Sequence, residues 1–210
     1  MKRGVGNKPM LPPDGIVSGQ DWRMQDALYL GKFRAQSIDE AMNVAFIEET
    51  KIEPKEHMRT EAREWKLGHP ESSIWRAHAL DLKDGGSSFA VYFSFWVYTP
   101  RSISMDDQVT ILLLVAGKGG VFVNGKPLAA GEGKTGQDLR TFIPFDRVEF
   151  RKGWNHILVK LAGGEQDIEN VQQRASLIFF MKFADLGTAR DMITAVSILP
   201  AEGDSSTLLK

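Results

Sequence analysis

The stretch FAVYFSFWVY, residues 89–98, decides the fold class of this chain. Successive side chains of an extended strand point to opposite faces of its sheet. One face then carries only apolar side chains, those of Phe89, Val91, Phe93, Phe95 and Val97. The other face carries Tyr92, Ser94, Trp96 and Tyr98. This alternation predicts a β-strand whose first face packs on a core.

Further segments of the same kind follow the first one, separated by short turns. They are QVTILLLVA (108–116), GGVFVNGKPLAA (119–130), TFIPF (141–145), RVEFRKGWNHILVKLA (147–162) and ASLIFFMKFA (175–184). A run of strands without helices between them excludes a doubly wound α/β fold and favours two antiparallel sheets packed face to face. We therefore expect a mainly β chain, an antiparallel two-sheet β-sandwich with one or two short helices.

Two turns in this region have a clear chemical signature. Asn124 and Gly125 both tolerate positive φ, which a type I′ hairpin requires. Gly153 permits a tight turn into the strand that follows it. Along that strand the alternation directs Ile157, Val159 and Leu161 to the core and predicts that His156 and Lys160 face out.

The first part of the chain is less regular. ALYLGKF (27–33) predicts a short strand broken by Gly31, and SIDEAMNVAF (37–46) predicts a helix with Ser37 as N-cap and Glu40 at the capping-box position. Residues 47–83 are polar and irregular, with a charged, helix-compatible piece at 54–65, and we expect a surface excursion anchored by Trp65 and Trp75. The predicted organisation is a flexible arm (1–15), a single domain (16–200) and a flexible tail (201–210).

Composition limits the classes of partner. The 210 residues include 26 basic and 27 acidic side chains, giving a net charge of -1, so no overall field attracts nucleic acid or anionic lipid. The longest apolar run, 111–116, has the length of a strand and is too short for direct membrane insertion. The chain has no cysteine, which excludes disulfides and thiolate metal sites. No signal peptide is recognised at the start, and both a cytoplasmic and an exported location fit these features.

Three segments in order resemble the jelly-roll modules of the galactose-binding-like and PA14-like superfamilies, which occur beside bacterial glycoside hydrolases. They are LYLGKF (28–33), VFVNGKPL (121–128) and RKGWNHILVKLA (151–162). The resemblance implies a jelly-roll β-sandwich and covers roughly residues 27–185. In that superfamily these motifs build the fold, and function lies in variable loops or on one sheet face, so the resemblance does not identify a ligand.

Four aromatic side chains are the candidate ligand-binding residues: Trp75, Tyr92, Trp96 and Tyr98. An exposed row of rings could stack on a sugar or dock against another protein. The alternative is that the helix or the excursion covers this face, because a large exposed apolar patch is costly. Trp75, like Trp65, could equally pin the excursion to the domain.

Signals for metal binding and catalysis are weak. Asp106 and Asp107 could contribute to a calcium site, but adjacent carboxylates in a turn are usually only solvated. The four histidines lack metal-ligand spacing, and no catalytic triad or carboxylate pair is identified. We therefore predict no cofactor and a non-catalytic interaction or accessory module that binds a protein partner. The alternative is a carbohydrate-binding module, and a glycan-active enzyme is the third hypothesis.

Overall fold

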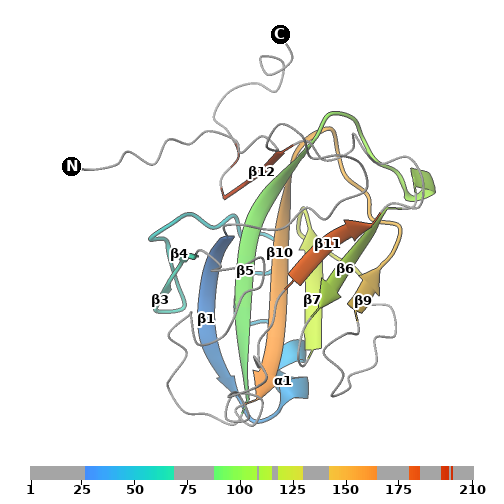
Figure 1. The fold of residues 1–210 in the computed structure, drawn as a ribbon. Helices are drawn as coiled ribbons and strands as arrows, with labels where there is room; N and C mark the ends of the chain where they lie inside the picture. The colour runs from blue at the N-terminus through green and yellow to red at the C-terminus, as the bar shows by residue number, and fades with distance from the viewer. Residues whose placement is uncertain are drawn as a thin grey trace.

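The computed structural model describes residues 27–68, 88–107, 109–114, 118–129, 142–164, 180–184, 195–198 and 200. This part of the chain is mainly β, with antiparallel strands and one short helix (Figure 1). The strands are β1 (Ala27–Ala35), β2 (Arg59–Thr60), β3 (Arg63–Glu64), β4 (Lys66–Gly68), β5 (Ser88–Thr99), β6 (Thr110–Leu114), β7 (Lys118–Val123), β8 (Lys126–Pro127), β9 (Phe142–Phe145), β10 (Gly153–Gly164), β11 (Phe180–Ala184) and β12 (Ala195–Ser197). The helix is α1 (Ile38–Asn43), and a single 3₁₀ turn spans Met105–Asp107.

The largest sheet has the strand order β4-β1-β5-β10-β7-β8, and β12 pairs with β5 as well. Its two longest strands, β5 and β10, run side by side through the centre of the molecule (Figure 1). They pair over their whole length, from Gly153 opposite Thr99 to Gly164 opposite Ser88. Every residue of β5 is buried, so both faces of the central strand are covered.

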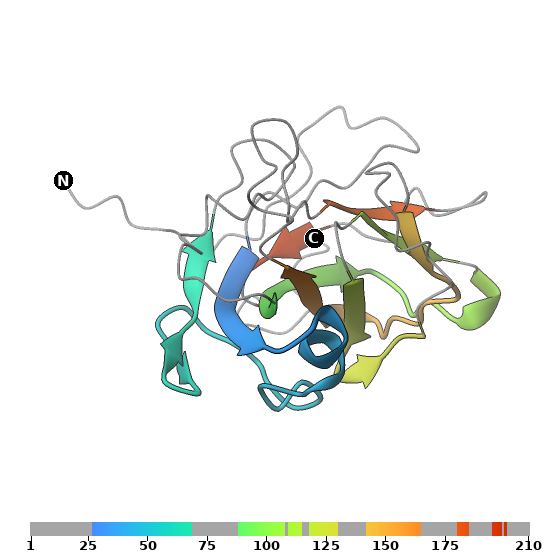
Figure 2. The ribbon, with the colours of Figure 1, turned by 90° about the horizontal axis from the view of Figure 1, so that it is seen from below.

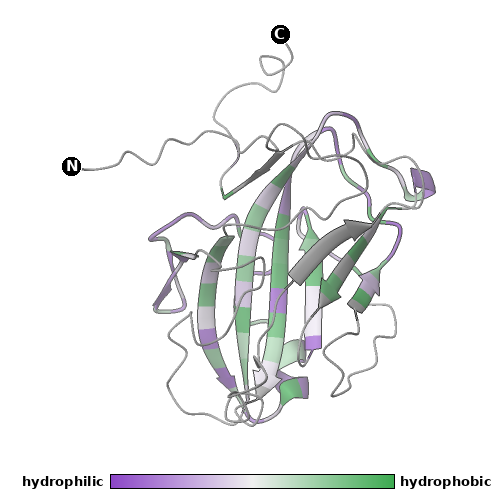
Figure 3. Ribbon diagram, viewed as in Figure 1, coloured by the Kyte–Doolittle hydropathy of each residue, from purple (hydrophilic) through white to green (hydrophobic). Residues whose placement is uncertain are grey.

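A second sheet, with the order β11-β6-β9, shares one apolar cluster with the first. The shared cluster receives the predicted core faces of two strands: Phe89, Val91, Phe93, Phe95 and Val97 from β5, and Ile157, Val159 and Leu161 from β10. Ile111 and Leu113 of β6 and Phe145 of β9 complete it from the second sheet. Hydrophobic and hydrophilic positions alternate along β5 and β10 (Figure 3). The membership of the shared cluster confirms the core side that the sequence predicts.

The opposite face of the main sheet is also covered. We call residues 44–54 the strap. This segment follows α1, and its side chains pack on the sheet together with α1 and Trp65 in a second apolar cluster. Seen from below, α1 lies across one end of β1, β5, β10 and β7 (Figure 2). One face of the main sheet therefore packs on the shared cluster, and the other packs on α1 and the strap.

The helix begins as predicted and ends earlier. Ser37 Oγ accepts a hydrogen bond from Glu40 N at 3.1 Å, and Glu40 Oε2 accepts one from Gln36 N at 2.6 Å, which satisfies two amides at the helix start. Helical backbone stops at Asn43, because Val44 is extended (φ -81°, ψ 125°). The predicted residues 44–46 of the helix instead begin the strap.

The turn predictions are confirmed. Asn124 and Gly125 have φ values of +51° and +77°, as a type I′ hairpin requires. Gly153 has φ +98°. The strand predicted at 27–33 extends to Ala35, with a register shift between Gly31 and Phe33.

The helix-compatible reading of residues 54–65 is wrong. This segment contains the β2–β3 hairpin, and the chain that follows it adds β4 to the edge of the main sheet beside β1. The predicted arm (1–15) and tail (201–210), and residues 69–83 of the predicted excursion, lie outside the described residues. Within the described residues, no helix is long and apolar enough to cross a membrane.

Candidate functional site

Side chains of β5 and β10 that point away from the shared cluster form a row on the covered face of the main sheet. We call this row the polar stripe; it comprises Tyr92, Ser94, Trp96, Tyr98, His156 and Lys160. The strand register places Lys160 opposite Tyr92 and His156 opposite Trp96. Because the two strands pair directly, these side chains are neighbours across the sheet. The stripe is where polar chemistry is concentrated in the interior.

The candidate ligand-binding rings of β5 are covered rather than exposed. The exposed fraction is 0% for Tyr92, 4% for Trp96 and 5% for Tyr98. Trp65, Ile47 and Phe33 pack in the same cluster as Tyr92, so the strap and the chain around Trp65 hide that ring. Of the two readings of this face, the covered one holds here, and these three rings offer no solvent-facing platform. The fourth candidate, Trp75, lies outside the described residues.

His156 and Lys160 do not face solvent as predicted. Their exposed fractions are 5% and 1%. The prediction is wrong because alternation along a strand separates two faces but does not tell whether a further layer covers the second one. Over Lys160 that layer is the strap, whose Val44 carbonyl and Glu49 carboxylate contact the ammonium.

Lys160 is the centre of a buried polar network. Its ammonium donates to the backbone carbonyl of Val44 at 2.6 Å and to Glu49 Oε1 at 2.9 Å. Tyr92 also donates to Glu49 Oε1, at 2.6 Å, and its oxygen accepts from the amide of Phe46 at 3.3 Å. The rings of Phe46 and Tyr92 lie 5.6 Å and 5.5 Å from the ammonium. The network therefore joins the strap to the two central strands.

The chemistry of Tyr92 follows from this setting. Burial raises the pKa of its phenol far above the ordinary value, and the hydrogen bond to Glu49 raises it further. The phenol therefore stays protonated and acts as a hydrogen-bond donor at any ordinary pH. Glu49 is in turn a carboxylate that accepts from an ammonium and a phenol at one oxygen.

Ser94 and His156 form a second polar pair in the stripe. Ser94 Oγ and His156 Nε2 are 2.8 Å apart, and the imidazole lies against the ring of Trp96 with centroids 4.9 Å apart. Burial lowers the pKa of His156 to about 4, so the ring is neutral at pH 7. Among the described residues, the indole nitrogen of Trp96 has no hydrogen-bond partner. A serine next to a neutral imidazole has the pairing of a nucleophile and base, but Ser94 is wholly buried and closed to substrate.

The calcium candidates Asp106 and Asp107 lie in the 3₁₀ turn Met105–Asp107. Asp107 accepts from Arg101 Nη2 at 2.9 Å and from the amide of Ser104 at 2.8 Å. The hydrogen bond from Arg101, followed by the one from Ser104, lowers the pKa of the Asp107 carboxyl. Asp107 thus stabilises its own loop, while Asp106 is exposed. In the part of the chain that the structure describes, no three histidine, aspartate or glutamate side chains are grouped as metal ligands.

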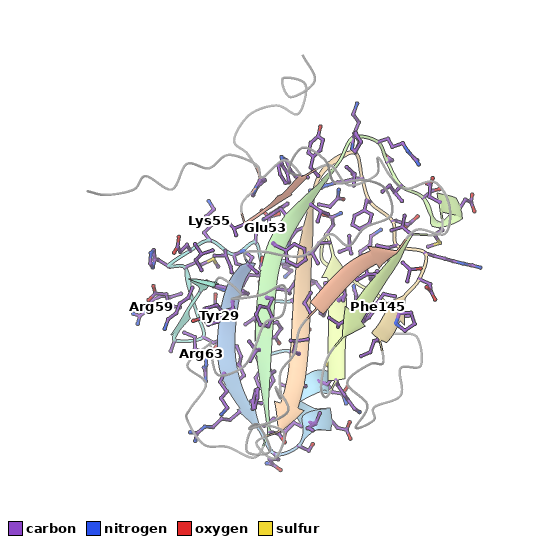
Figure 4. All side chains as sticks on the ribbon, viewed as in Figure 1. Tyr29, Glu53, Lys55, Arg59, Arg63 and Phe145 are labelled. Atoms are coloured by element: carbon purple, nitrogen blue, oxygen red, sulfur yellow. The ribbon has the colours of Figure 1, made fainter. Side chains whose placement is uncertain are left out.

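The β2–β3 hairpin follows the strap in the chain and has an exposed tip. Its tip residues, Glu61 and Ala62, have φ values of +48° and +59°, a left-handed conformation that only glycine and asparagine adopt readily. Arg59, Arg63 and Lys55 lie on this side of the molecule, and Phe145 lies on the opposite side (Figure 4). The hairpin presents a charged surface on an unusual backbone.

The base of the hairpin is anchored in the interior. Trp65 is fully buried, exchanges backbone hydrogen bonds with His57 and Met58, and donates from its indole to Thr60 Oγ1 at 3.1 Å. The Arg63 guanidinium donates to the carbonyl of Lys32 at 3.0 Å and lies 4.3 Å from the ring centre of Phe33. The tip is thus presented from a rigid base.

Sequence reasoning identified some of these residues and missed others. Trp65 is an anchor, as expected. Glu49, Ser94 and the hairpin tip were not singled out, and Lys160 was assigned to solvent. One signal could have found the network, because Lys160 shares its face of β10 with His156 and pairs with the aromatic row of β5. A lysine beside an aromatic row on a covered face needs a carboxylate partner.

Comparison with known proteins identifies no family. No protein-family model and no curated protein matches the sequence. Part of a solved β-glucosidase from Kluyveromyces marxianus is distantly similar in structure, with a TM-score of 0.39 and 12% sequence identity. The match covers 75% of this chain and 14% of that one, so the chain corresponds to a small part of the β-glucosidase.

Proposed function

We propose that this protein is a non-catalytic interaction module that binds a protein partner through the β2–β3 hairpin. We also propose that its two sheets form a jelly-roll β-sandwich of the galactose-binding-like kind. The apolar cluster shared by the two sheets supports that architecture, as do the hairpin at Asn124 and the turn at Gly153 that carry the resemblance.

The binding proposal depends on one observation: the β2–β3 hairpin has a strained tip, and its base is anchored in the interior. Glu61 and Ala62 are exposed, and each occupies a conformation that costs an ordinary residue roughly 1–2 kcal/mol. Glycine or asparagine would form the same turn without that strain. Strain kept at an exposed tip supports a role for these side chains in recognition.

The exposed surface around the tip fits a polypeptide better than a polyanion. Met58 is 37% exposed beside Arg59, and Glu61 and Glu64 lie on the same hairpin as Arg59 and Arg63. Both charge signs are therefore present next to an apolar side chain, as in the rims and anchors of protein interfaces. Such a mixture gives no continuous positive field for nucleic acid or anionic lipid.

A catalytic role receives no support from the stripe. Its Ser94, His156 and Lys160 are buried. Ser94 and His156 are hydrogen-bonded to each other, and Lys160 is paired with Glu49. The carbohydrate-binding alternative loses three of its four candidate rings, since Tyr92, Trp96 and Tyr98 are covered. That alternative depends on Trp75.

The experiment is crosslinking followed by a charge-reversal test. A photo-reactive residue at Glu61 should capture a partner in cells, and the captured protein is then purified and its affinity for the wild type is measured. We expect Arg59→Glu to weaken that affinity at least tenfold. The matched control is Lys126→Glu, a reversal of an exposed lysine on β8 at the opposite edge of the sheet.

Two results would contradict the proposal. One is equal binding by the wild type and Arg59→Glu, or equal losses in Arg59→Glu and Lys126→Glu. The other is saturable binding of a polysaccharide by the wild type, reported by tryptophan fluorescence, which would favour the carbohydrate-binding alternative.

A further inference from the structure

The strap is held to the main sheet by polar contacts that converge on two side chains. Lys160 binds the Val44 carbonyl and the Glu49 carboxylate, and Tyr92 binds the same carboxylate and the Phe46 amide. Within the described residues, the strap pairs with no strand, and its backbone hydrogen bonds at Glu49, Lys51 and Ile52 are local. Its buried side chains are Ile47, with 7% exposed, and Pro54, while Phe46 and Ile52 pack partly buried against the second apolar cluster.

Burial of Lys160 fixes what its partner must be. An ammonium that is 1% exposed loses nearly all of its hydration and needs an anion in contact. A well-packed apolar side chain at this position would avoid that cost, and buried ion pairs are generally no more stabilising than such a replacement. Stability alone therefore does not explain the Lys160–Glu49 pair. Specific binding of a carboxylate at this position explains it better.

The arrangement of donors and rings around Lys160 fits a ligand that has one carboxylate and an apolar group beside it. A single oxygen, Glu49 Oε1, receives both the ammonium and the phenol. The site supplies one positive charge and one neutral donor, which balances a monoanion. The rings of Phe46 and Tyr92 lie close to the ammonium, and Phe33 packs edge-on against Tyr92 with centroids 5.7 Å apart. Aromatic walls of this kind suit an organic acid.

We propose that Lys160 and Tyr92 form a binding site for an organic carboxylate, and that Glu49 occupies this site as an internal ligand that can be displaced. An external carboxylate and the strap then compete for the same two donors. Segments that are held by few buried contacts open at a lower free-energy cost than the sheets they cover. This site is separate from the hairpin tip, and its tests use the purified protein alone.

The first test removes the internal ligand. Glu49→Ala leaves the Lys160 ammonium without its anion, and the melting temperature of this variant should rise with the concentration of added acetate or propionate at constant ionic strength, following the linkage of a bound ligand. Chloride at the same ionic strength should not replace them. The variant Glu49→Ala/Lys160→Met should lose the effect, and Glu48→Ala, at an exposed neighbour, should respond like the wild type.

The second test asks whether Glu49 can be displaced in the wild type, and it does not depend on the folding of any variant. Hydrogen exchange is measured with and without propionate or benzoate at constant ionic strength. We expect peptides from 44–54 to exchange at least threefold faster with the acid, while peptides from β10 are unchanged. If the strap exchanges only by global unfolding, or if neither acid accelerates it, Glu49 is a fixed structural partner and the proposal is overturned. Failure of Glu49→Ala to respond to acetate would also overturn it.

Discussion

Replacement of Gly125 by alanine is expected to destabilise the protein far more than replacement of Gly153. Both glycines have left-handed backbones, with φ of +77° and +98°. A Cβ in this region costs roughly 1–2 kcal/mol. This backbone penalty is common to the two variants, so Gly153→Ala provides a matched control for conformational strain.

The two positions differ in the space available for a Cβ atom. A Cβ at Gly153 would meet nothing within 4 Å, whereas a Cβ at Gly125 would lie 2.1 Å from the backbone oxygen of Thr50 in the strap. Either the turn or the strap must move by roughly an ångström, and overpacking of this kind costs about 1–3 kcal/mol. The expected loss is therefore about 2–5 kcal/mol for Gly125→Ala, against about 1–2 kcal/mol for Gly153→Ala.

Urea unfolding, followed by tryptophan fluorescence and far-ultraviolet circular dichroism, gives both free energies. Hydrogen exchange adds a more specific readout, because Gly125→Ala should accelerate exchange in residues 44–54 and Gly153→Ala should not. The contrary outcomes are equal destabilisation by the two substitutions and a strap that exchanges at the wild-type rate in Gly125→Ala. Either result would show that the contact between this turn and the strap is not the cause of the destabilisation.

Three further predictions concern the cap, the buried histidine and the hairpin tip. Ser37→Ala should lower the free energy of unfolding by about 1 kcal/mol, because the amide of Glu40 loses its acceptor, and Ser37→Thr should retain most of the stability; equal unfolding curves for all three proteins would contradict this. The pKa of His156 falls from 6.5 to about 4 on folding, so its contribution to stability is fully present above pH 6.5 and declines as the pH falls toward 4, by about 2 kcal/mol at pH 5. Unfolding measured from pH 7 to 5 should show this decline in the wild type and a shallower one in His156→Gln. Ala62→Gly should raise the free energy of unfolding by about 0.5–1 kcal/mol by relieving the left-handed strain, and a lower value would show that the tip is unstrained.

The features that local chemistry determines were predicted well. The helix start needs only Ser37 and Glu40, the type I′ turn needs only Asn124 and Gly125, and both are found where the sequence places them. The core faces of β5 and β10 follow from alternation along a single strand. In each case, the residues that decide the structure are a few positions apart.

Features that depend on a second layer were not predicted. Residues 54–65 are charged and compatible with a helix, but they form a hairpin that is followed by the buried Trp65. The tip of this hairpin, Glu61 and Ala62, has a backbone conformation that contradicts the local preference of these residues. Likewise, alternation gave no sign that Lys160 is covered. Its partner, Glu49, is 111 residues away in sequence, and nothing in a local pattern connects the two.

Two of the three segments that carry the resemblance, 121–128 and 151–162, are joined by structural hydrogen bonds. Asn155 is fully buried; its side-chain oxygen accepts from Asn124 at 2.8 Å and from the amide of Arg151 at 2.9 Å, and its nitrogen donates to the carbonyls of Arg151 and Gly153. These bonds fix the β7–β8 hairpin against the start of β10.

Every polar atom of the Asn155 side chain is therefore committed to backbone and turn geometry, which leaves it none for a ligand. The strap and the hairpin tip lie outside the three resembling segments and are the parts that local rules do not explain. Residues that satisfy neither local preference nor simple burial are where function is to be sought. By that criterion, the covering chain of residues 44–66 is where both proposed functions, partner binding at the hairpin and carboxylate binding beneath the strap, are to be tested.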